Sequence, residues 1–172
     1  MGGTGAYIMG FFGAVFASIT LATQRGWSGV WLALPFALFV LIALAAFRAT
    51  RSGALPLPPG AGRVILWSSV AEGVGLFLAA NIVANLHHDW LLLPAMALVV
   101  GLHFVPMGLA IPFRPFLWLA AALLIASALG FVLTPPVGPE IAGFGAALAL
   151  WLAALLAVRR QMRHRTLARS TA

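Results

Sequence analysis

Six long apolar runs dominate the sequence and constrain its fold more than any other feature. Each run has about 20 residues, enough for a helix rising about 1.5 Å per residue to cross a hydrocarbon core of about 30 Å. Backbone polar groups cannot stay unpaired in lipid, and alternating barrel strands would be far more polar, so each run is predicted to be a helix. The predicted membrane helices span residues 6–24, 27–47, 64–86, 90–111, 115–134 and 141–158.

The segments between these runs contain residues that end helices. Prolines and glycines gather there, most clearly in 56–60 and 135–139, and such clusters mark loops. None of these segments is long enough to form a separate soluble domain. The sequence therefore predicts an all-α, polytopic membrane protein in which residues 1–158 form one compact bundle of six transmembrane helices and residues 159–172 form a basic tail.

The composition excludes several other classes of protein. Hydrophobic residues make up 63% of the chain and charged residues 8%, whereas about a quarter of the residues in soluble domains are charged. The sequence has no cysteine, which excludes a disulfide framework and thiol redox chemistry. The positive charge lies between apolar blocks, so nucleic acid is not expected as a partner.

The arginines predict the orientation of the bundle. One side of the six predicted crossings holds a single arginine, Arg25, and the two acids Asp89 and Glu140. Every other arginine falls on the opposite side. Those arginines are Arg48, Arg51, Arg63, Arg114, Arg159, Arg160, Arg163, Arg165 and Arg169. Because cytoplasmic loops retain positive charge during insertion, both termini are expected in the cytoplasm, with the protein in a bacterial inner membrane.

Two ionisable side chains are predicted to lie deep in the hydrocarbon, where a charge costs about 3 kcal/mol on insertion scales. Glu72 lies about 14 Å beyond Arg63 at the helical rise, and His103 lies about 16 Å before Arg114 in the next helix. The short connection at 87–89 makes these two helices antiparallel neighbours. We therefore expect the carboxyl and the imidazole to meet at one depth, where they can share a proton.

Glu72 also lies on a polar stripe. Ser68, Ser69, Glu72, Gly75 and Ala79 follow one another at the spacings of three and four residues that form one helical face. Such a face is typical of close packing or of a cavity lining. The two serines therefore join the glutamate and the deep histidine as candidate ligands for a proton or a small solute.

Pro106 adds a further expectation to this region. Proline lacks the N–H that would bond to the carbonyl of Leu102, four residues earlier in the helix. The sequence therefore predicts a free carbonyl beside His103 and a helix bend centred on 104–106.

A secondary polar cluster is predicted at the end of the same helix that carries Glu72. Asn81, Asn85 and His88 are spaced to share one face, which lies about half a turn from the glutamate stripe.

No metal or cofactor site is predicted. The side chains of 87–89 with Glu140 are types that zinc accepts, but adjacent histidines point in different directions and a solvated turn is the favoured interpretation. His103 is the one deep histidine, so paired axial ligands for haem are not expected.

Other features indicate close packing between helices. Trp151 lies about ten residues into the last predicted helix, away from the headgroup level that indole favours, so its N–H is expected to bond to a partner helix. Small residues also recur at a spacing of four, which lets helices approach closely. The pairs are Gly10 and Ala14, Gly13 and Ala17, and Gly143 and Ala147.

Three functions remain open from the sequence. The first is a transporter or channel-like protein that handles a proton or a small solute at the Glu72 and His103 site. The second is a non-catalytic scaffold or accessory subunit in which these residues cross-link helices. The third and less favoured is a small intramembrane enzyme with Ser68 or Ser69 as nucleophile. The basic tail is expected to lie against anionic lipid, and a homo-oligomer is compatible with the small-residue spacings.

Overall fold

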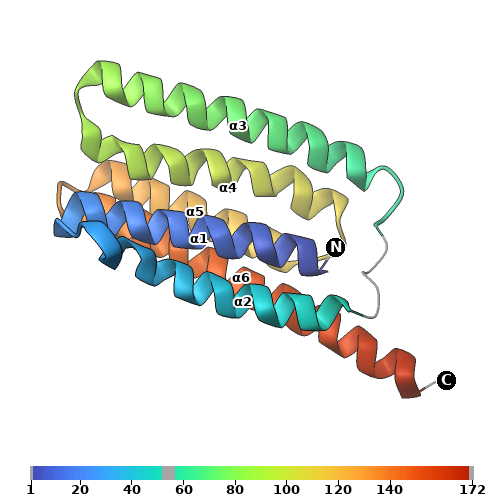
Figure 1. Cartoon of the computed structure of the whole chain (residues 1–172). Helices are drawn as coiled ribbons and strands as arrows, with labels where there is room; N and C mark the ends of the chain where they lie inside the picture. The colour runs from blue at the N-terminus through green and yellow to red at the C-terminus, as the bar shows by residue number, and fades with distance from the viewer. Residues whose placement is uncertain (1, 52–56, 171–172) are drawn as a thin grey trace.

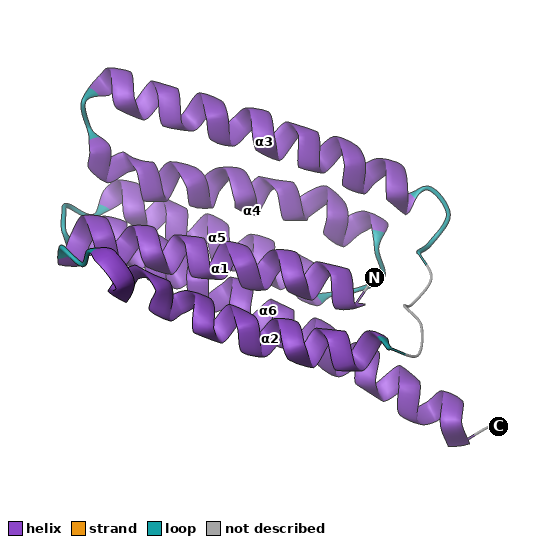
Figure 2. Ribbon diagram, in the orientation of Figure 1, coloured by secondary structure: helices purple, strands orange, loops and turns teal. Residues whose placement is uncertain are grey.

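The computed structural model describes residues 2–51 and 57–170, and this part of the chain contains six long helices (Figure 2). The helices are α1 Gly2–Arg25, α2 Leu34–Thr50, α3 Ala61–Leu86, α4 Leu92–Ala110, α5 Pro115–Val132 and α6 Val137–Ser170. Two short 3-10 helices, η1 Gly29–Ala33 and η2 Asp89–Leu91, lead into α2 and α4. Six helical spans are long and apolar enough to cross a membrane. The prediction of an all-α, multi-pass bundle of six helices is confirmed.

The helices lie side by side, with α6 at the centre of the contacts (Figure 1). α6 packs against α1 and α5 along most of their length and also touches α4 and α2. α4 packs on α5, while α3 lies at the edge of the bundle and packs against α4. Both termini lie at the same end of the bundle, as an even number of crossings requires.

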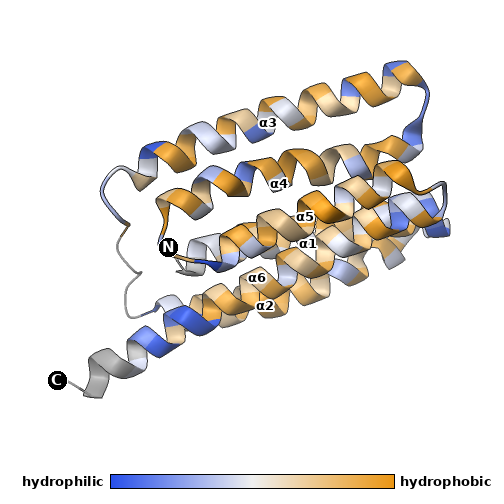
Figure 3. Cartoon of the chain, turned by 180° about the vertical axis from the view of Figure 1, so that it is seen from behind, coloured by the Kyte–Doolittle hydropathy of each residue, from blue (hydrophilic) through white to orange (hydrophobic). Residues whose placement is uncertain are grey.

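α6 is longer than the sequence predicted. The expected break at 135–139 is shorter, since the helix already begins at Val137; Pro139 then lies in the first turn, where its missing N–H would have no helical partner. The helix also continues past Val158 through the arginine-rich segment to Ser170, because arginine, glutamine and methionine favour helix. Hydrophilic residues gather on this extension (Figure 3). Residues 171–172 of the predicted tail lie outside the described residues.

The contact between α1 and α6 depends on residues without large side chains. The indole Nε1 of Trp151 donates a hydrogen bond to the carbonyl oxygen of Gly10 across 3.2 Å, which confirms that this N–H finds a partner helix. A Cβ on Gly13 would lie 2.6 Å from the indole Cδ1 and Nε1. A Cβ on Gly143 would likewise overlap the buried side chain of Thr20. The glycines therefore let the two helices approach closely.

Replacement of Trp151 by phenylalanine is expected to lower the free energy of unfolding by about 0.6 kcal/mol. The change keeps an aromatic ring against α1 but removes the N–H donor, and interhelical hydrogen bonds in membranes are typically of this size. SDS-induced unfolding in mixed micelles, followed by circular dichroism, measures the difference. Trp118→Phe is the control, because this indole is 75% exposed. An equal loss in both variants would show that the hydrogen bond to Gly10 contributes nothing.

A second close contact holds α4 against α5. The hydroxyl of Ser127 donates a hydrogen bond to the carbonyl oxygen of Pro94 across 2.8 Å, and this contact is buried. A Cβ on Gly130 would lie 2.8 Å from the ring of the same proline, and one on Gly101 would lie 3.1 Å from Leu123. α4 is thus fixed to the core of the bundle on this side, and its other side faces α3.

Candidate functional site

The structure brings Glu72 and His103 together between α3 and α4. The carboxylate Oε2 lies 3.5 Å from the imidazole Nδ1, and the two side chains are 12% and 8% exposed, respectively. Glu72 lies about 16 Å from the start of α3 at Ala61 and about 21 Å from its end at Leu86, at the helical rise. The pair is therefore near the middle of the membrane-spanning part of the bundle.

The sequence of α3 explains how this helix presents the carboxyl to α4. Ser68 is buried and Glu72 and Gly75 are partly buried, which is the periodicity of a single helical face. A Cβ on Gly75 would lie 2.8 Å from Val99 of α4, so the glycine permits close approach beside the pair. Ser69 is exposed, because it is about 100° further round the helix than Ser68. The predicted stripe thus contributes one serine to the interface with α4.

The pair can hold one proton in two arrangements. His103 Nδ1 is buried and makes no hydrogen bond within the described residues, and the Glu72 oxygen is 3.5 Å away. A protonated carboxyl beside a neutral imidazole has no net charge, and neither has a carboxylate beside an imidazolium. Each arrangement avoids an unpaired charge, which would be costly in a site of low dielectric. The geometry therefore suits storage or transfer of a single proton.

The ring of Phe104 packs against the histidine and connects it to the aromatic core of the bundle. The Phe104 ring meets the His103 ring edge-on, with centroids 5.0 Å apart, and Phe116 of α5 lies 5.6 Å from Phe104. Pro106 lies inside α4, which continues to Ala110; the bend expected there stays a prediction.

The serines are not engaged with the histidine. Within the described residues, no hydrogen bond joins Ser68 or Ser69 to His103. The contact between nucleophile and base that a serine hydrolase uses is thus not made in this structure.

The secondary polar cluster on α3 does not join the Glu72 site. Asn81 Nδ2 donates to the carbonyl oxygen of Phe77 across 2.7 Å, and Asn85 Nδ2 donates to the carbonyl oxygen of Asn81 across 2.8 Å. Both amides are exposed, as is His88 at the following turn. In the described part of the chain, no group of three or more histidine, aspartate or glutamate side chains could hold a metal ion.

One ion pair was missed by the sequence reasoning. Arg25 at the end of α1 contacts Glu140 in the first turn of α6, with the guanidinium nitrogen 2.9 Å from the carboxylate oxygen. The sequence placed both residues on the same side of the membrane, but it did not show that α1 and α6 are neighbours. A basic last turn and an acidic first turn are the signal that could have suggested the contact.

No protein-family model matches the chain, and no curated protein and no solved structure matches it. The function of the protein is therefore inferred from the geometry of its own sites.

Proposed function

We propose that the protein handles protons, or a small solute that exchanges with a proton, at the Glu72 and His103 pair. The observation that carries the proposal is the 3.5 Å separation of a carboxylate and an imidazole at mid-membrane depth. Ionisable residues in such positions commonly mark ion pathways and proton relays. The arginine distribution supports an orientation with both termini in the cytoplasm, and location in a bacterial inner membrane is part of the same proposal.

The proton transfer is a simple exchange between the two side chains. The O–H of a protonated Glu72 gives its proton to the neutral Nδ1 of His103, which leaves a carboxylate and an imidazolium. The imidazolium can then release a proton from Nε2 on the opposite edge of the ring, which returns a neutral imidazole. Two further changes complete the cycle: the carboxylate takes up a new proton, and the imidazole changes tautomer so that its proton moves from Nδ1 back to Nε2.

The position of α3 supports access to this pair. In its most apolar stretch 6% of the residues are buried, against 50% in α6, and α3 has extensive contact with α4 alone among the described helices. Segments with few buried contacts open at low free energy. A small shift of α3 away from α4 would expose the carboxyl without disturbing the contacts among α1, α4, α5 and α6.

Glu72→Gln is expected to lower proton flux at least tenfold, because an amide cannot release a proton. The measurement uses purified protein in liposomes that contain a pH-sensitive dye, with a potassium diffusion potential as the driving force. His103→Ala is expected to lower flux as well, because it removes the acceptor 3.5 Å from the carboxyl. Glu140→Gln is the matched control, since this acid lies at the start of α6 and pairs with Arg25.

Two outcomes would contradict the proposal. The first is a wild-type flux no greater than that of empty liposomes, and the second is wild-type flux in both Glu72→Gln and His103→Ala. A loss in these two variants with retention in Glu140→Gln would support it.

An accessory or scaffold function is the second candidate, and the outer face of α3 favours it. Away from α4, this helix exposes Ser69 and Gly73 and, further round its surface, Asn81 and Asn85, and polar side chains between membrane helices are used for association. In that case Glu72 and His103 fix α3 to α4 and move no proton. The liposome assay separates the two functions: the scaffold predicts no flux from the wild type and a lower unfolding free energy for Glu72→Ala.

A further inference from the structure

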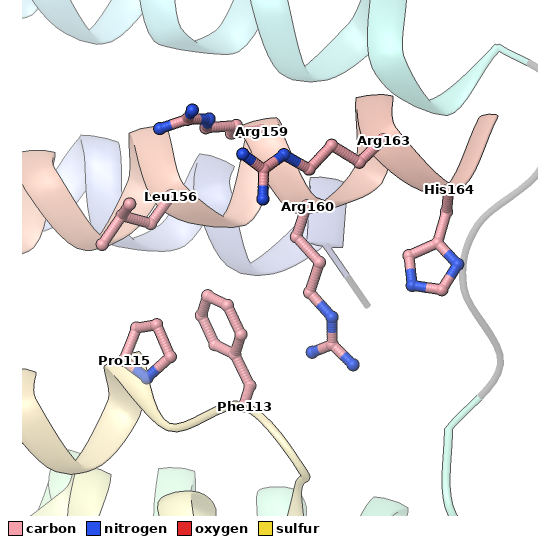
Figure 4. A pocket seen from close by; sticks show the side chains of 7 residues that line it. All are labelled: Phe113, Pro115, Leu156, Arg159, Arg160, Arg163 and His164. Atoms are coloured by element: carbon pink, nitrogen blue, oxygen red, sulfur yellow. The ribbon is translucent and has the colours of Figure 1, made fainter. Parts of the chain in front are cut away.

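A basic groove lies at the end of the bundle where α6 extends beyond the other helices. The groove is lined by four cationic or titratable side chains of α6, by Phe113 from the connection between α4 and α5, and by Pro115 at the start of α5. The α6 side chains are Arg159, Arg160, Arg163 and His164, of which Arg160 reaches toward Phe113 (Figure 4). The groove has a volume of about 390 Å³. The spacings of these α6 residues are those of one helical face, so the continuous helix gathers their charges at one place.

The charge of this groove has no carboxylate side chain to neutralise it. The sequence contains three acidic residues. Glu72 lies beside His103 in the middle of the bundle, Glu140 pairs with Arg25 near the start of α6, and Asp89 begins η2 at the turn after α3. The arginines of the groove are thus available to an external anion. Guanidinium groups bind phosphate through two parallel hydrogen bonds, so a phosphate group suits the site.

The Phe113 ring positions one arginine of the groove. The guanidinium carbon of Arg160 lies 5.1 Å from the centre of the Phe113 ring, a distance at which a cation is attracted to an aromatic face. The buried Phe113 ring in turn packs edge-on against Phe116 of α5, with centroids 5.0 Å apart. One arginine is therefore held against the bundle before any ligand binds.

An apolar groove continues from the basic one along the contact of α5 and α6. Both grooves are lined by Pro115 and Leu156. The apolar groove has a volume of about 360 Å³, with Trp118 at its wall and the small residues Ala122 and Ala149 along it. A ligand that fills both grooves has an anionic end and a long apolar end. The alanines leave room for the apolar part, which a free phosphate lacks.

We propose that these two grooves form one binding site for an anionic phospholipid. The phosphate group binds Arg160 and Arg163 where α6 leaves the apolar part of the membrane, and an acyl chain lies in the groove between α5 and α6. Basic pockets between membrane helices are a recognised form of lipid headgroup site. This site is separate from the Glu72 and His103 pair, and neither groove is lined by those two residues.

The headgroup part of the site is tested with Arg160→Gln/Arg163→Gln. Purified protein in detergent is titrated with dioleoyl phosphatidylglycerol, and the lipid-bound fraction is measured by native mass spectrometry. Each arginine beside an anionic lipid contributes a factor of roughly fivefold, so the double variant is expected to bind about 30-fold more weakly. Arg51→Gln/Arg63→Gln is the matched control, because it removes the same charge outside the groove. An equal loss of binding in the two double variants would overturn the proposal.

The acyl-chain part is tested with Ala122→Phe, which fills the apolar groove from an exposed position on α5. The variant is expected to weaken binding of the long-chain lipid at least fivefold, while the exposed neighbouring change Ala121→Phe leaves it unaltered. Dioleoyl phosphatidylcholine is expected to bind more weakly than the anionic lipid. Displacement of the bound lipid by millimolar inorganic phosphate, or unchanged binding in Ala122→Phe, would show a phosphate site without an acyl groove and would overturn the proposal.

Discussion

Gly143→Ala is expected to lower the free energy of unfolding by about 3 kcal/mol, at the upper end of the usual effect of overpacking. A Cβ at this position of α6 would overlap the side chain of Thr20 in α1. Thr20 is fully buried, and its hydroxyl donates a hydrogen bond to the carbonyl oxygen of Phe16 across 2.7 Å. A β-branched side chain held in this way cannot rotate out of the contact, so α1 and α6 must move apart.

The measurement is SDS-induced unfolding of the purified protein in mixed micelles, followed by circular dichroism. Gly73→Ala is the matched control, because the same change on α3 meets no atom within 4 Å. The control is expected to unfold at the wild-type concentration of SDS or slightly above it, because alanine favours a helix more than glycine does. If Gly143→Ala and Gly73→Ala unfolded at the same concentration of SDS, close approach of α1 and α6 at Gly143 would not contribute to stability.

Leu150→Ala is expected to lower the free energy of unfolding by about 2 kcal/mol. The Leu150 side chain on α6 is 1% exposed, and its removal leaves a cavity in the core of the bundle. Cavities of this kind cost about 2–5 kcal/mol in soluble proteins. We expect a loss at the lower end of this range, because the helices stay in an apolar surrounding when they separate. Moving the leucine side chain from the core to that surrounding then costs little, and the cavity itself accounts for most of the loss.

Leu148→Ala provides the control for this prediction. It is the same substitution two residues earlier on α6, but the Leu148 side chain is 64% exposed and faces away from the core. The expected change in unfolding free energy is below about 0.5 kcal/mol, as for substitutions away from packed contacts. A similar loss in both leucine variants would show that packing of α6 does not dominate the stability of the bundle.

Much of the fold could be predicted because lipid leaves the backbone few choices. The apolar runs near 64–86 and 115–134 begin and end within three residues of α3 and α5, since proline, glycine and polar residues bound them. The end of α6 was predicted at 158 because hydropathy falls there. Hydropathy marks where a helix leaves the apolar layer, whereas the helix itself continues as long as its residues favour helical backbone.

The candidate site could be predicted in part. Depth along two consecutive helices was sufficient to pair Glu72 with His103, because a short connection makes such helices antiparallel neighbours. The spacing of three and four residues did not distinguish buried Ser68 from exposed Ser69. A broad polar stripe includes both serines, although adjacent positions on a helix differ by about 100°. The contact of Arg25 with Glu140 joins the first and last helices, and no short connection indicates that contact.

The sequence by itself determined that this chain crosses a membrane six times and that one glutamate and one histidine lie deep among apolar residues. Both conclusions depend on hydropathy and helical rise, which are properties of single helices. Only the tertiary structure decided that α6 lies at the centre and α3 at the edge, and that the arginines of α6 border an apolar groove on α5. Helix neighbours are selected by the fit of small and large side chains across a contact, such as Gly13 against Trp151, and such a fit involves two segments distant in sequence.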